Sequence, residues 1–308
     1  MKKVALVGCG RWGRNHAKHL SELGCEFVGI ADPDIEIEQV AKQFNTNYFK
    51  DYKELPSNID AVLVVASTNR HYEIVKYFLE KGKNVFVEKP CAQTQIQVKE
   101  LIDLATMNNL ILNTGYLMRF NPAVQKLKER LLEVGQIRYA RATNIHERQA
   151  RTDSGVIINL GIHPLDIILF LFNQKPYGLK CMTTGSPNLE KAAILSLDYG
   201  SYIVVIEAAC EAHGLKDKTV EVVGERATFR LNWLEQSLIK YAQGKEPEIW
   251  KPEIETDFLM EEIKHFLECL EFGNNNNLGK EDLITMKICD HALESAINRR
   301  WVHLQWDH

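Results

Sequence analysis

Two residues of this 308-residue chain have side chains suited to moving a proton: Lys89, which stands between Glu88 and Pro90, and His163, four residues after Asn159. A lysine ammonium group could hydrogen-bond a substrate hydroxyl and stabilise the alkoxide that forms as a hydride leaves. A histidine could accept the proton. Both residue types also serve as ordinary surface or packing residues. The sequence around them therefore has to decide between the two interpretations.

A glycine-rich segment near the N-terminus indicates what the hydride acceptor would be. The strand-like run 4–7 leads into Gly8-Cys9-Gly10-Arg11-Trp12-Gly13, and a helical stretch follows. In this pattern the first glycine allows a tight turn, the second lets the backbone approach a pyrophosphate, and the third lets helix and strand pack closely. The pyrophosphate would lie on free N–H groups at the helix N-terminus. The segment predicts a dinucleotide-binding site.

Asp32 favours NAD over NADP. It lies at the end of the second apolar run, about twenty residues after the glycines, where a carboxylate accepts hydrogen bonds from ribose hydroxyls and repels a 2′-phosphate. Acidic residues and no Arg or Lys follow it over 33–36. The alternative is that Asp32 only caps the next helix.

The first 120 residues alternate strand-like and helical runs. Strands are expected near 4–7, 27–31, 61–66, 84–87 and 110–113, with amphipathic helices near 16–23, 37–44, 71–80 and 96–106. This alternation predicts a doubly wound parallel sheet of the Rossmann type, in which ligands bind outside the carboxyl ends of the strands. The residues expected to contact the cofactor are the motif residues and those at strand ends: Gly8, Gly10, Arg11, Trp12, Gly13, Asp32, Ser67, Thr68, Asn69, His71, Glu88 and Lys89.

The pattern changes after about residue 121. A helix near 123–132, a strand near 137–145 and a helix near 160–172 precede six successive strands between 179 and 241. Short turns separate these strands, which predicts an open, largely antiparallel sheet. Two helices, near 257–272 and 280–299, close the chain, and the asparagine-rich segment 273–277 between them is interpreted as a solvated turn. The chain is therefore expected to be α/β, with a Rossmann domain over 1–120 and an α+β domain over 121–308.

Composition narrows the function classes. The net charge is −4 and the pI is near 6.2, which argues against nucleic acid or an anionic membrane as a partner. Seven cysteines without a CxxC pair indicate reduced thiols in the cytoplasm and no metal site. The lack of a recognisable signal peptide also predicts a cytoplasmic location. Cys9 and Cys91 are expected to be small packing residues.

Together, the glycine motif, Glu88-Lys89-Pro90 and the second-domain strand pattern make the whole chain resemble the glucose–fructose oxidoreductase/inositol dehydrogenase (Gfo/Idh/MocA) family. The resemblance implies a Rossmann domain with NAD, a second domain whose open sheet forms a homodimer or homotetramer, and Lys89 as the catalytic lysine.

The same resemblance assigns His163 as the family's proton-accepting histidine, on a helix that lines the substrate site. Asn159 stands where the family usually has an aspartate. The spacing of four residues still places both side chains on one helical face. An amide cannot relay a proton, so Asn159 is expected to hydrogen-bond the sugar. Asp166 is either an orienting partner of His163, a solvent-facing helix residue or a helix cap.

Within the family, the segment 115–124 and the run 153–158 resemble the branch of UDP-N-acetylglucosamine 3-dehydrogenases. Tyr116, Arg119 and Asn121 are accordingly expected to bind substrate, with Arg119 gripping a diphosphate or a carboxylate. The alternative for Arg119 is an ion pair between the domains. Arg148 and Arg151 are further candidates for an anionic substrate.

The resulting hypothesis is an NAD-dependent oxidation at C3 of a UDP-N-acetylhexosamine, with a small-molecule substrate and no metal. Two alternatives remain open: a dehydrogenase of inositol or free sugars, and a catalytically silent NAD-binding regulator, which the asparagine at position 159 would suit.

Overall fold

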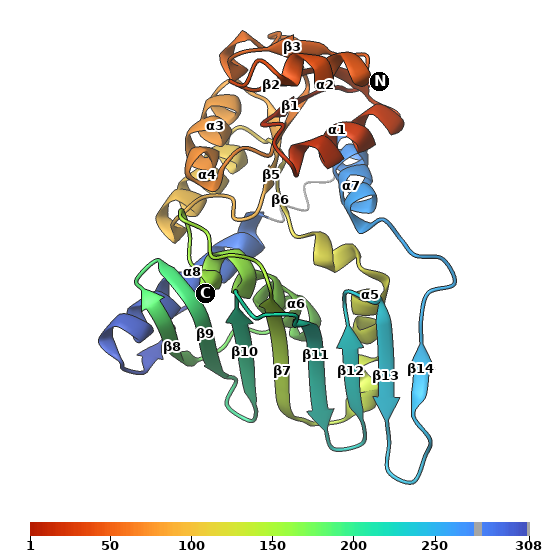
Figure 1. Ribbon diagram of the computed structural model, residues 1–308, viewed down its shortest axis with the longest axis vertical. Coiled ribbons are helices and arrows are strands. Elements are labelled where there is room, and N and C mark those ends of the chain that lie inside the picture. The colour runs from red at the N-terminus through yellow and green to blue at the C-terminus, as the bar shows by residue number, and fades with distance from the viewer. Residues whose placement is uncertain (274–278, 307–308) are drawn as a thin grey trace. The chain divides into compact units, whose positions relative to one another are not determined.

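The computed structural model describes residues 1–273 and 279–306. The chain divides into two compact units (Figure 1). Unit 1 comprises Met1–Leu117 and Asp257–Met286, and unit 2 comprises Met118–Thr256 and Lys287–His308. Neither unit is a contiguous segment, since the chain returns to unit 1 at Asp257 and to unit 2 at Lys287. The segment Asp257–Met286 belongs with the parallel sheet because its apolar residues complete that sheet's core. Of the predicted turn at 273–277, residues 274–277 lie outside the described part.

Unit 1 contains a six-stranded parallel sheet, which confirms the Rossmann-type prediction. Its strand order is β3-β2-β1-β4-β5-β6, so the chain reverses direction across the sheet between β1 and β4. Four of the predicted strands are almost continuously buried, as a sheet covered on both faces requires. The strands are β1 (Lys3–Val7), β2 (Glu26–Ala31), β3 (Asn47–Phe49), β4 (Ala61–Val64), β5 (Asn84–Glu88) and β6 (Leu112–Gly115).

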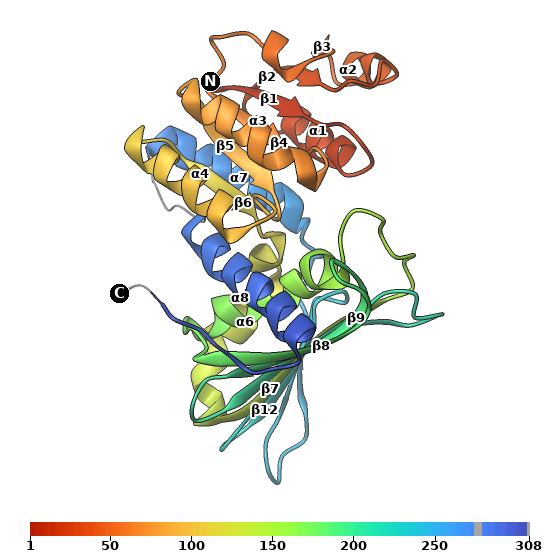
Figure 2. The same cartoon turned by 90° about the vertical axis from the view of Figure 1, so that its left-hand side faces the viewer.

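Helices cover both faces of this sheet. Buried residues of α1 (Gly13–Glu22), α2 (Ile37–Gln43) and α7 (Phe258–Phe272) share one hydrophobic core with residues of the sheet. Helices α3 (Thr68–Glu80) and α4 (Gln95–Met107) pack against each other, side by side in Figure 2. Helix α8 (Gly279–Asn298) begins in unit 1 and ends in unit 2.

Unit 2 contains a nine-stranded sheet of order β14-β13-β12-β11-β7-β10-β9-β8-β15. All neighbours are antiparallel except β7 and β10, which run parallel. The prediction of a largely antiparallel sheet is confirmed. The strands are β7 (Ile137–His146), β8 (Gly178–Ser186), β9 (Leu189–Asp198), β10 (Ile203–Ala209), β11 (Lys216–Gly224), β12 (Thr228–Asn232), β13 (Ser237–Tyr241), β14 (Glu248–Trp250) and β15 (Val302–His303).

The two faces of this sheet differ. The inner face packs on α5 (Pro122–Arg130) and α6 (Ile162–Phe172), and its residues, such as Val204 and Ile206, are fully buried. The alternate residues form the outer face, where Ile203 is 51% and Ile194 is 44% exposed. The π-helical segment η4 (Ile157–Gly161) runs directly into α6 and contacts β7, β9 and β10.

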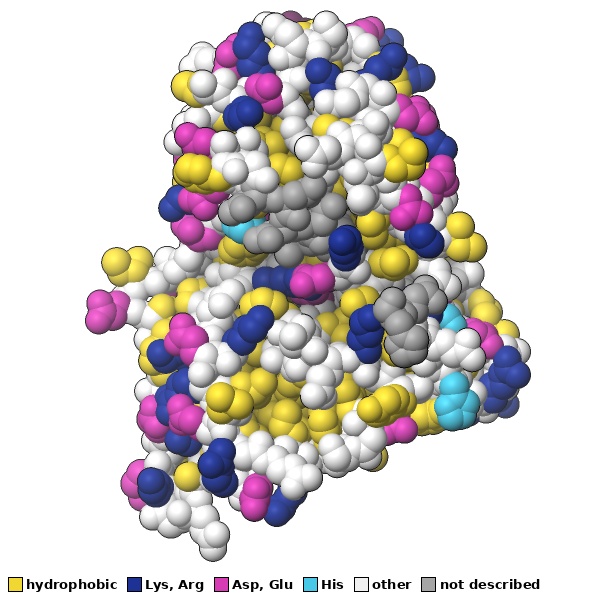
Figure 3. All heavy atoms as spheres, turned by 180° about the vertical axis from the view of Figure 1, so that it is seen from behind, with side chains coloured by type: hydrophobic (Ala, Val, Ile, Leu, Met, Phe, Trp, Pro, Cys, Tyr) yellow, Lys and Arg dark blue, Asp and Glu magenta, His cyan; other side chains and the backbone are white. Residues whose placement is uncertain are grey.

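No helix within 1–273 and 279–306 combines the length and apolar character needed to span a bilayer. On the face of the molecule shown in Figure 3, acidic and basic side chains are interspersed, in keeping with the small net charge.

Candidate functional site

The glycine loop has the shape that the sequence motif predicts. Gly8 has φ +88°, and a Cβ there would lie 2.6 Å from the backbone of Ala66. A Cβ on Gly13 would lie 2.3 Å from the carbonyl oxygen of Gly8, whereas one on Gly10 would meet no atom within 4 Å. The loop is thus closed on its inner side and open at Gly10. No side chain caps the N-terminus of α1, so its N–H groups are suited to a pyrophosphate.

The side chain of Asp32 accepts bonds from two backbone N–H groups and does not cap α2, whose N-cap residue is Glu36. Its Oδ2 accepts a hydrogen bond from the backbone N–H of Cys9 at 2.7 Å, and its Oδ1 accepts one from Asp34 at 2.9 Å. The carboxylate therefore ties the glycine loop to the end of β2. A carboxylate has about four lone-pair positions, so two bonds leave acceptor capacity for ribose hydroxyls. The loop and Asp32 together fit a dinucleotide such as NAD.

The strand-end residues 67–71 are placed differently from one another. Ser67 is the residue before α3 and makes no capping bond with its side chain, and both Ser67 and Asn69 are exposed at the helix N-terminus, with Thr68 half-buried. His71 was expected to contact the cofactor, but it is 1% exposed. Its Nδ1 lies 2.7 Å from the Pro90 carbonyl oxygen and its Nε2 lies 2.9 Å from that of Ala66. In this structure His71 connects the ends of β4 and β5, and burial lowers its pKa.

Glu88 forms the contact that joins the two motifs of unit 1. Its Oε1 accepts hydrogen bonds from Trp12 Nε1 at 2.6 Å and from His16 Nε2 at 2.9 Å. Burial raises the pKa of Glu88, but the bonds from His16 and Trp12 and the charge of Lys89 lower it by more. The pKa of Glu88 is therefore below its ordinary value. Trp12, expected to contact the cofactor, donates its indole N–H here, and the residue as a whole stays 41% exposed. His16 was not identified from the sequence.

Lys89 follows Glu88 at the end of β5 and is half-buried, with a cis peptide bond to Pro90. The next residue, Cys91, donates its backbone N–H to Asp282 Oδ2 at 3.2 Å. The hydroxyl of Tyr116 donates to Oδ1 of the same carboxylate. Tyr116 is 2% exposed, so its phenol supports the strand ends instead of presenting to a substrate as predicted. Asp282, in the first turn of α8, was also missed by the sequence analysis.

In unit 2, Asn159 and His163 lie on consecutive helical turns and are both half-buried. Asn159 belongs to η4 and His163 to the first turn of α6. The backbone N–H of Asn159 donates to the Gly155 carbonyl at 3.1 Å. A π-helical turn is energetically costly and is found preferentially at functional sites. That both side chains contact one small molecule stays a prediction.

Arg119 and Asn121 are placed differently from the prediction. Arg119 Nε lies 3.1 Å from both carboxylate oxygens of Asp166, and its Nη2 contacts Oδ1, with both residues buried. Asn121 is fully buried, caps α5 through Ala123 and donates to the Trp233 carbonyl at 2.9 Å. A guanidinium committed to a buried carboxylate is not available to grip a diphosphate, and the ion pair lies within unit 2 rather than between the domains. Asp166 is 1% exposed and therefore does not face solvent.

The other candidates for an anionic substrate also differ from each other. Arg151 is bonded at the surface to Asp153, with Nε–Oδ1 2.6 Å. Arg148 makes no ion pair with any described residue.

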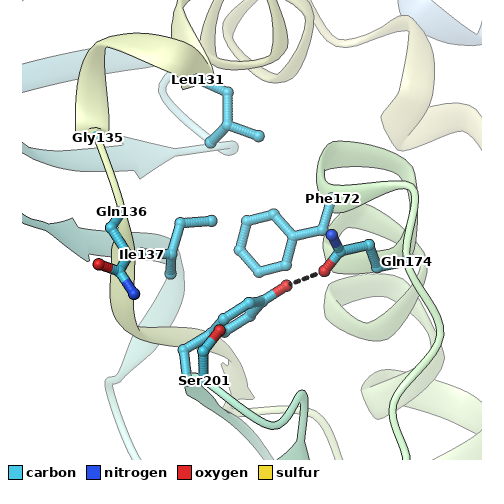
Figure 4. Close-up of a pocket in the computed structure, with 8 residues that line it drawn as sticks. Leu131, Gly135, Gln136, Ile137, Phe172, Gln174 and Ser201 are labelled. Carbon is cyan, nitrogen blue, oxygen red and sulfur yellow. Dashed lines mark hydrogen bonds between the residues drawn. The ribbon is translucent and has the colours of Figure 1, made fainter.

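A small cavity of about 230 Å³ in unit 2 contains none of the predicted residues (Figure 4). Phe172 and Ile137 point into it, and the Tyr202 hydroxyl donates to Gln174 Oε1 at 2.8 Å. The cavity adjoins the starts of β7 and β10, whereas η4 is bonded near the end of β7 through Asn144. Its volume is below that of pockets that enclose drug-sized ligands. Over the described ranges, no three His, Cys, Asp or Glu residues are grouped as metal ligands.

Comparisons with known families agree with this geometry. Residues 2–116 match a family model described as "Oxidoreductase family, NAD-binding Rossmann fold", and residues 124–230 match "GFO/IDH/MocA C-terminal domain".

Among curated proteins, the chain is 28% identical over 182 residues to a UDP-N-acetylglucosamine 3-dehydrogenase of Acidithiobacillus ferrooxidans. This alignment covers 58% of this chain and 57% of that protein. It is 26% identical to the scyllo-inositol 2-dehydrogenase (NAD(+)) of Bacillus subtilis, over 88% of this chain and 86% of that protein.

Among solved structures, that Acidithiobacillus enzyme superposes with a TM-score of 0.86 at 22% identity, over 96% of this chain and 97% of the other. An inositol dehydrogenase homolog from Azotobacter vinelandii, solved with NADH and myo-inositol, gives a TM-score of 0.86 at 18% identity, over 98% and 97% of the two chains. At these identities the superpositions establish the fold.

Proposed function

The chain belongs to the Gfo/Idh/MocA oxidoreductase family, with an NAD-binding Rossmann domain, and on that basis we propose that it is a dehydrogenase of a sugar secondary alcohol. The substrate we propose is a UDP-N-acetylhexosamine oxidised at C3. The observation that carries the dehydrogenase assignment is the Trp12–Glu88 hydrogen bond, which fixes the residue preceding Lys89 against the glycine loop.

NAD, when bound, supplies the hydride acceptor. Lys89 donates a hydrogen bond to the oxygen of the reacting hydroxyl and stabilises the negative charge that grows on it as the C–H hydride leaves. His163 accepts the hydroxyl proton, so that the carbinol becomes a ketone and one proton remains on the imidazole. Asn159 holds a neighbouring sugar group with its amide, because an amide neither gains nor loses a proton at neutral pH.

The nucleotide-sugar substrate is supported by the likeness to the UDP-N-acetylglucosamine 3-dehydrogenase, in sequence and in fold. It is not supported by Tyr116, Arg119 and Asn121, which are buried. An inositol substrate is the second candidate, because inositol dehydrogenases match the chain over a larger share of its length. The silent-regulator alternative rests on Asn159 and is opposed by the presence of both Lys89 and His163.

The first experiment follows NADH absorbance with NAD and UDP-N-acetylglucosamine, beside inositols and free sugars. The wild type is expected to reduce NAD with the UDP-sugar. Lys89→Ala should lose at least about 100-fold in kcat, in the range for proton-transfer groups, while binding NADH normally. Lys81→Ala, at an exposed lysine of the same unit, is the matched control. Turnover with inositol alone would select the second candidate, and full activity of Lys89→Ala would overturn the assigned chemistry.

We further propose a homodimer or homotetramer formed through the outer face of the unit 2 sheet. The support is the apolar surface of that face, where Met182 is 60% and Ile203 is 51% exposed. We also propose a cytoplasmic location, supported by the seven cysteines, all of which are free thiols.

A further inference from the structure

Lys218 is a charged residue on the apolar side of β11. It alternates in phase with Val220 and Val222, both fully buried on the inner face of the sheet. Across the strand pair its partner is Asn144 of β7, which is 3% exposed. On the other side, its carbonyl accepts a hydrogen bond from the backbone N–H of Trp233 at 3.1 Å. Lys218 itself is half-buried. A lysine in such a position needs a negative partner, because burial disfavours its charge.

The groups around Lys218 are positive. Burial lowers its pKa, and the positive charges of Arg148 and Lys216 lower it further. The pKa of His146 is lowered in the same way, by burial and then by Lys218, Arg148 and Lys216. Lys216 is compensated by Glu147 at 2.9 Å. Over 1–273 and 279–306, neither Lys218 nor Arg148 forms an ion pair or a side-chain hydrogen bond. Positive charge at this end of β7 and β11 thus exceeds negative charge.

The cluster lies beside the helical turn of Asn159 and His163, within the same unit. Asn144, the cross-strand partner of Lys218, donates from Nδ2 to the carbonyl of Leu160 in η4 at 2.9 Å. Ala208, the partner of Asn144 on β10, lies against the same segment, since a Cβ on Gly161 would be 3.5 Å from its Cβ. Cross-strand partners are about 5 Å apart at Cβ. The backbone of Lys218 therefore lies on the strand next to Asn144, whose side chain bonds the η4 backbone.

We propose that Lys218 and Arg148 bind the diphosphate of the nucleotide-sugar substrate, in the place first assigned to Arg119. This inference rests on the proposed function and names the group by which that substrate is held. A guanidinium can bind two phosphate oxygens at once, and an ammonium supplies a compact charge. The bound diphosphate gives the half-buried Lys218 the counter-charge that no residue of the described part of the chain provides.

The test measures binding rather than turnover. With the protein saturated by NADH, so that the cofactor site is filled, UDP and uridine are titrated calorimetrically into the wild type, Lys218→Met and Arg148→Met. Each variant should weaken UDP binding by about 10-fold or more, the range of a charge-assisted hydrogen bond, and leave uridine and NADH affinity within about two-fold. Lys245→Met and Arg138→Met, at exposed positions of the same unit, are the matched controls.

A structural role for Lys218 would give a different result. Methionine fits the apolar phase of β11, so Lys218→Met should keep or raise the melting temperature while UDP binding falls. A lower melting temperature with unchanged UDP affinity would overturn the proposal. Glucuronate is titrated in the same way. If the variants weaken glucuronate binding and leave UDP affinity unchanged, the cluster binds a sugar carboxylate and the proposal is overturned.

The proposal and the proposed function fail separately. If the wild type oxidises UDP-N-acetylglucosamine and both variants keep its KM, the anion site is wrong and the activity stands. If UDP binding depends on Lys218 but no UDP-sugar reduces NAD, the site stands and the activity is wrong.

Discussion

The indole N–H of Trp12 donates to the Glu88 carboxylate at 2.6 Å, across 76 residues of sequence. The bond joins the glycine loop to the segment that carries Lys89. Because His16 contacts the same oxygen, one buried carboxylate fixes the start of α1 and the end of β5. Placement of Lys89 therefore depends on the loop that is expected to hold the cofactor.

Glu88→Gln should weaken both the fold and cofactor binding. Glutamine keeps one acceptor oxygen but presents an N–H₂ group where the carboxylate accepts, and an unmatched buried polar group costs about 1–3 kcal/mol. Denaturant unfolding and NADH fluorescence titration measure the two effects. Glu80→Gln, at an exposed glutamate, is the control. Unchanged NADH affinity would show that this bond does not order the loop.

The same variant carries a pH dependence with a defined sign. The pKa of Glu88 is below its ordinary value of 4.5 in the folded protein, so the folded state favours the charged form. The stabilisation is present above about pH 4.5 and is lost as the pH falls through the lower folded value. The stability difference between wild type and Glu88→Gln should therefore shrink on acidification below pH 4.5. A difference that grows there would contradict the sign.

Arg119 and Asp166 should behave as a buried pair and not as substrate ligands. Removing one partner leaves an unpaired buried charge, so Arg119→Met or Asp166→Asn should cost about 3–5 kcal/mol of unfolding free energy. The double variant should recover much of that loss, and a double-mutant cycle by urea unfolding measures it. Arg151→Met, at a surface pair, should change stability by under about 1 kcal/mol. If Arg119→Met raised the KM for the substrate and left the stability unchanged, Arg119 would instead be a ligand of the substrate diphosphate.

Asn159→Asp tests how a neutral residue at this position affects His163. A carboxylate one helical turn away favours the charged form of the imidazole. The acidic limb of the kcat/KM profile should move to higher pH, and kcat should rise at alkaline pH if the aspartate takes part in proton transfer. The measurement is a pH–rate profile with the UDP-sugar, with Asn58→Asp, at an exposed turn of unit 1, as the control. A profile identical to that of the wild type would separate residue 159 from proton transfer.

Ile203→Lys should reduce self-association if the outer face of the unit 2 sheet binds a second copy. A lysine in the middle of an apolar interface would be buried without a partner. Light scattering behind a sizing column measures the mass. Leu132→Lys, at a residue 87% exposed outside the sheet, should leave the mass unchanged. An equal mass for wild type and Ile203→Lys would remove this face as the interface.

The parts of this molecule that depend on local pattern could be predicted from sequence. Gly8 and Gly13 are required by backbone approaches of under 3 Å, and their spacing shows it. Apolar runs bounded by helices or short turns indicated most strands, but the three-residue β3 and β14 and the two-residue β15 are too short to show such a pattern.

The errors concern side chains whose partners are distant in sequence. Arg119 meets Asp166 47 residues away, and Tyr116 meets Asp282 166 residues away. A segment that resembles a substrate-binding stretch does not reveal such partners. Lys218 did carry a local signal, because it occupies an apolar phase of its strand, but that signal becomes meaningful only once the inner face is known.

Cys9 can serve as a chemical probe of how often the glycine loop opens. Its side chain is fully buried, and burial raises the pKa of the thiol to about 11. An alkylating reagent therefore reacts with Cys9 only during the moments when the loop opens. The rate at which this residue is labelled therefore measures how often the glycine loop opens. Slower labelling in the presence of a dinucleotide would show that the dinucleotide binds to the loop, without a need for turnover.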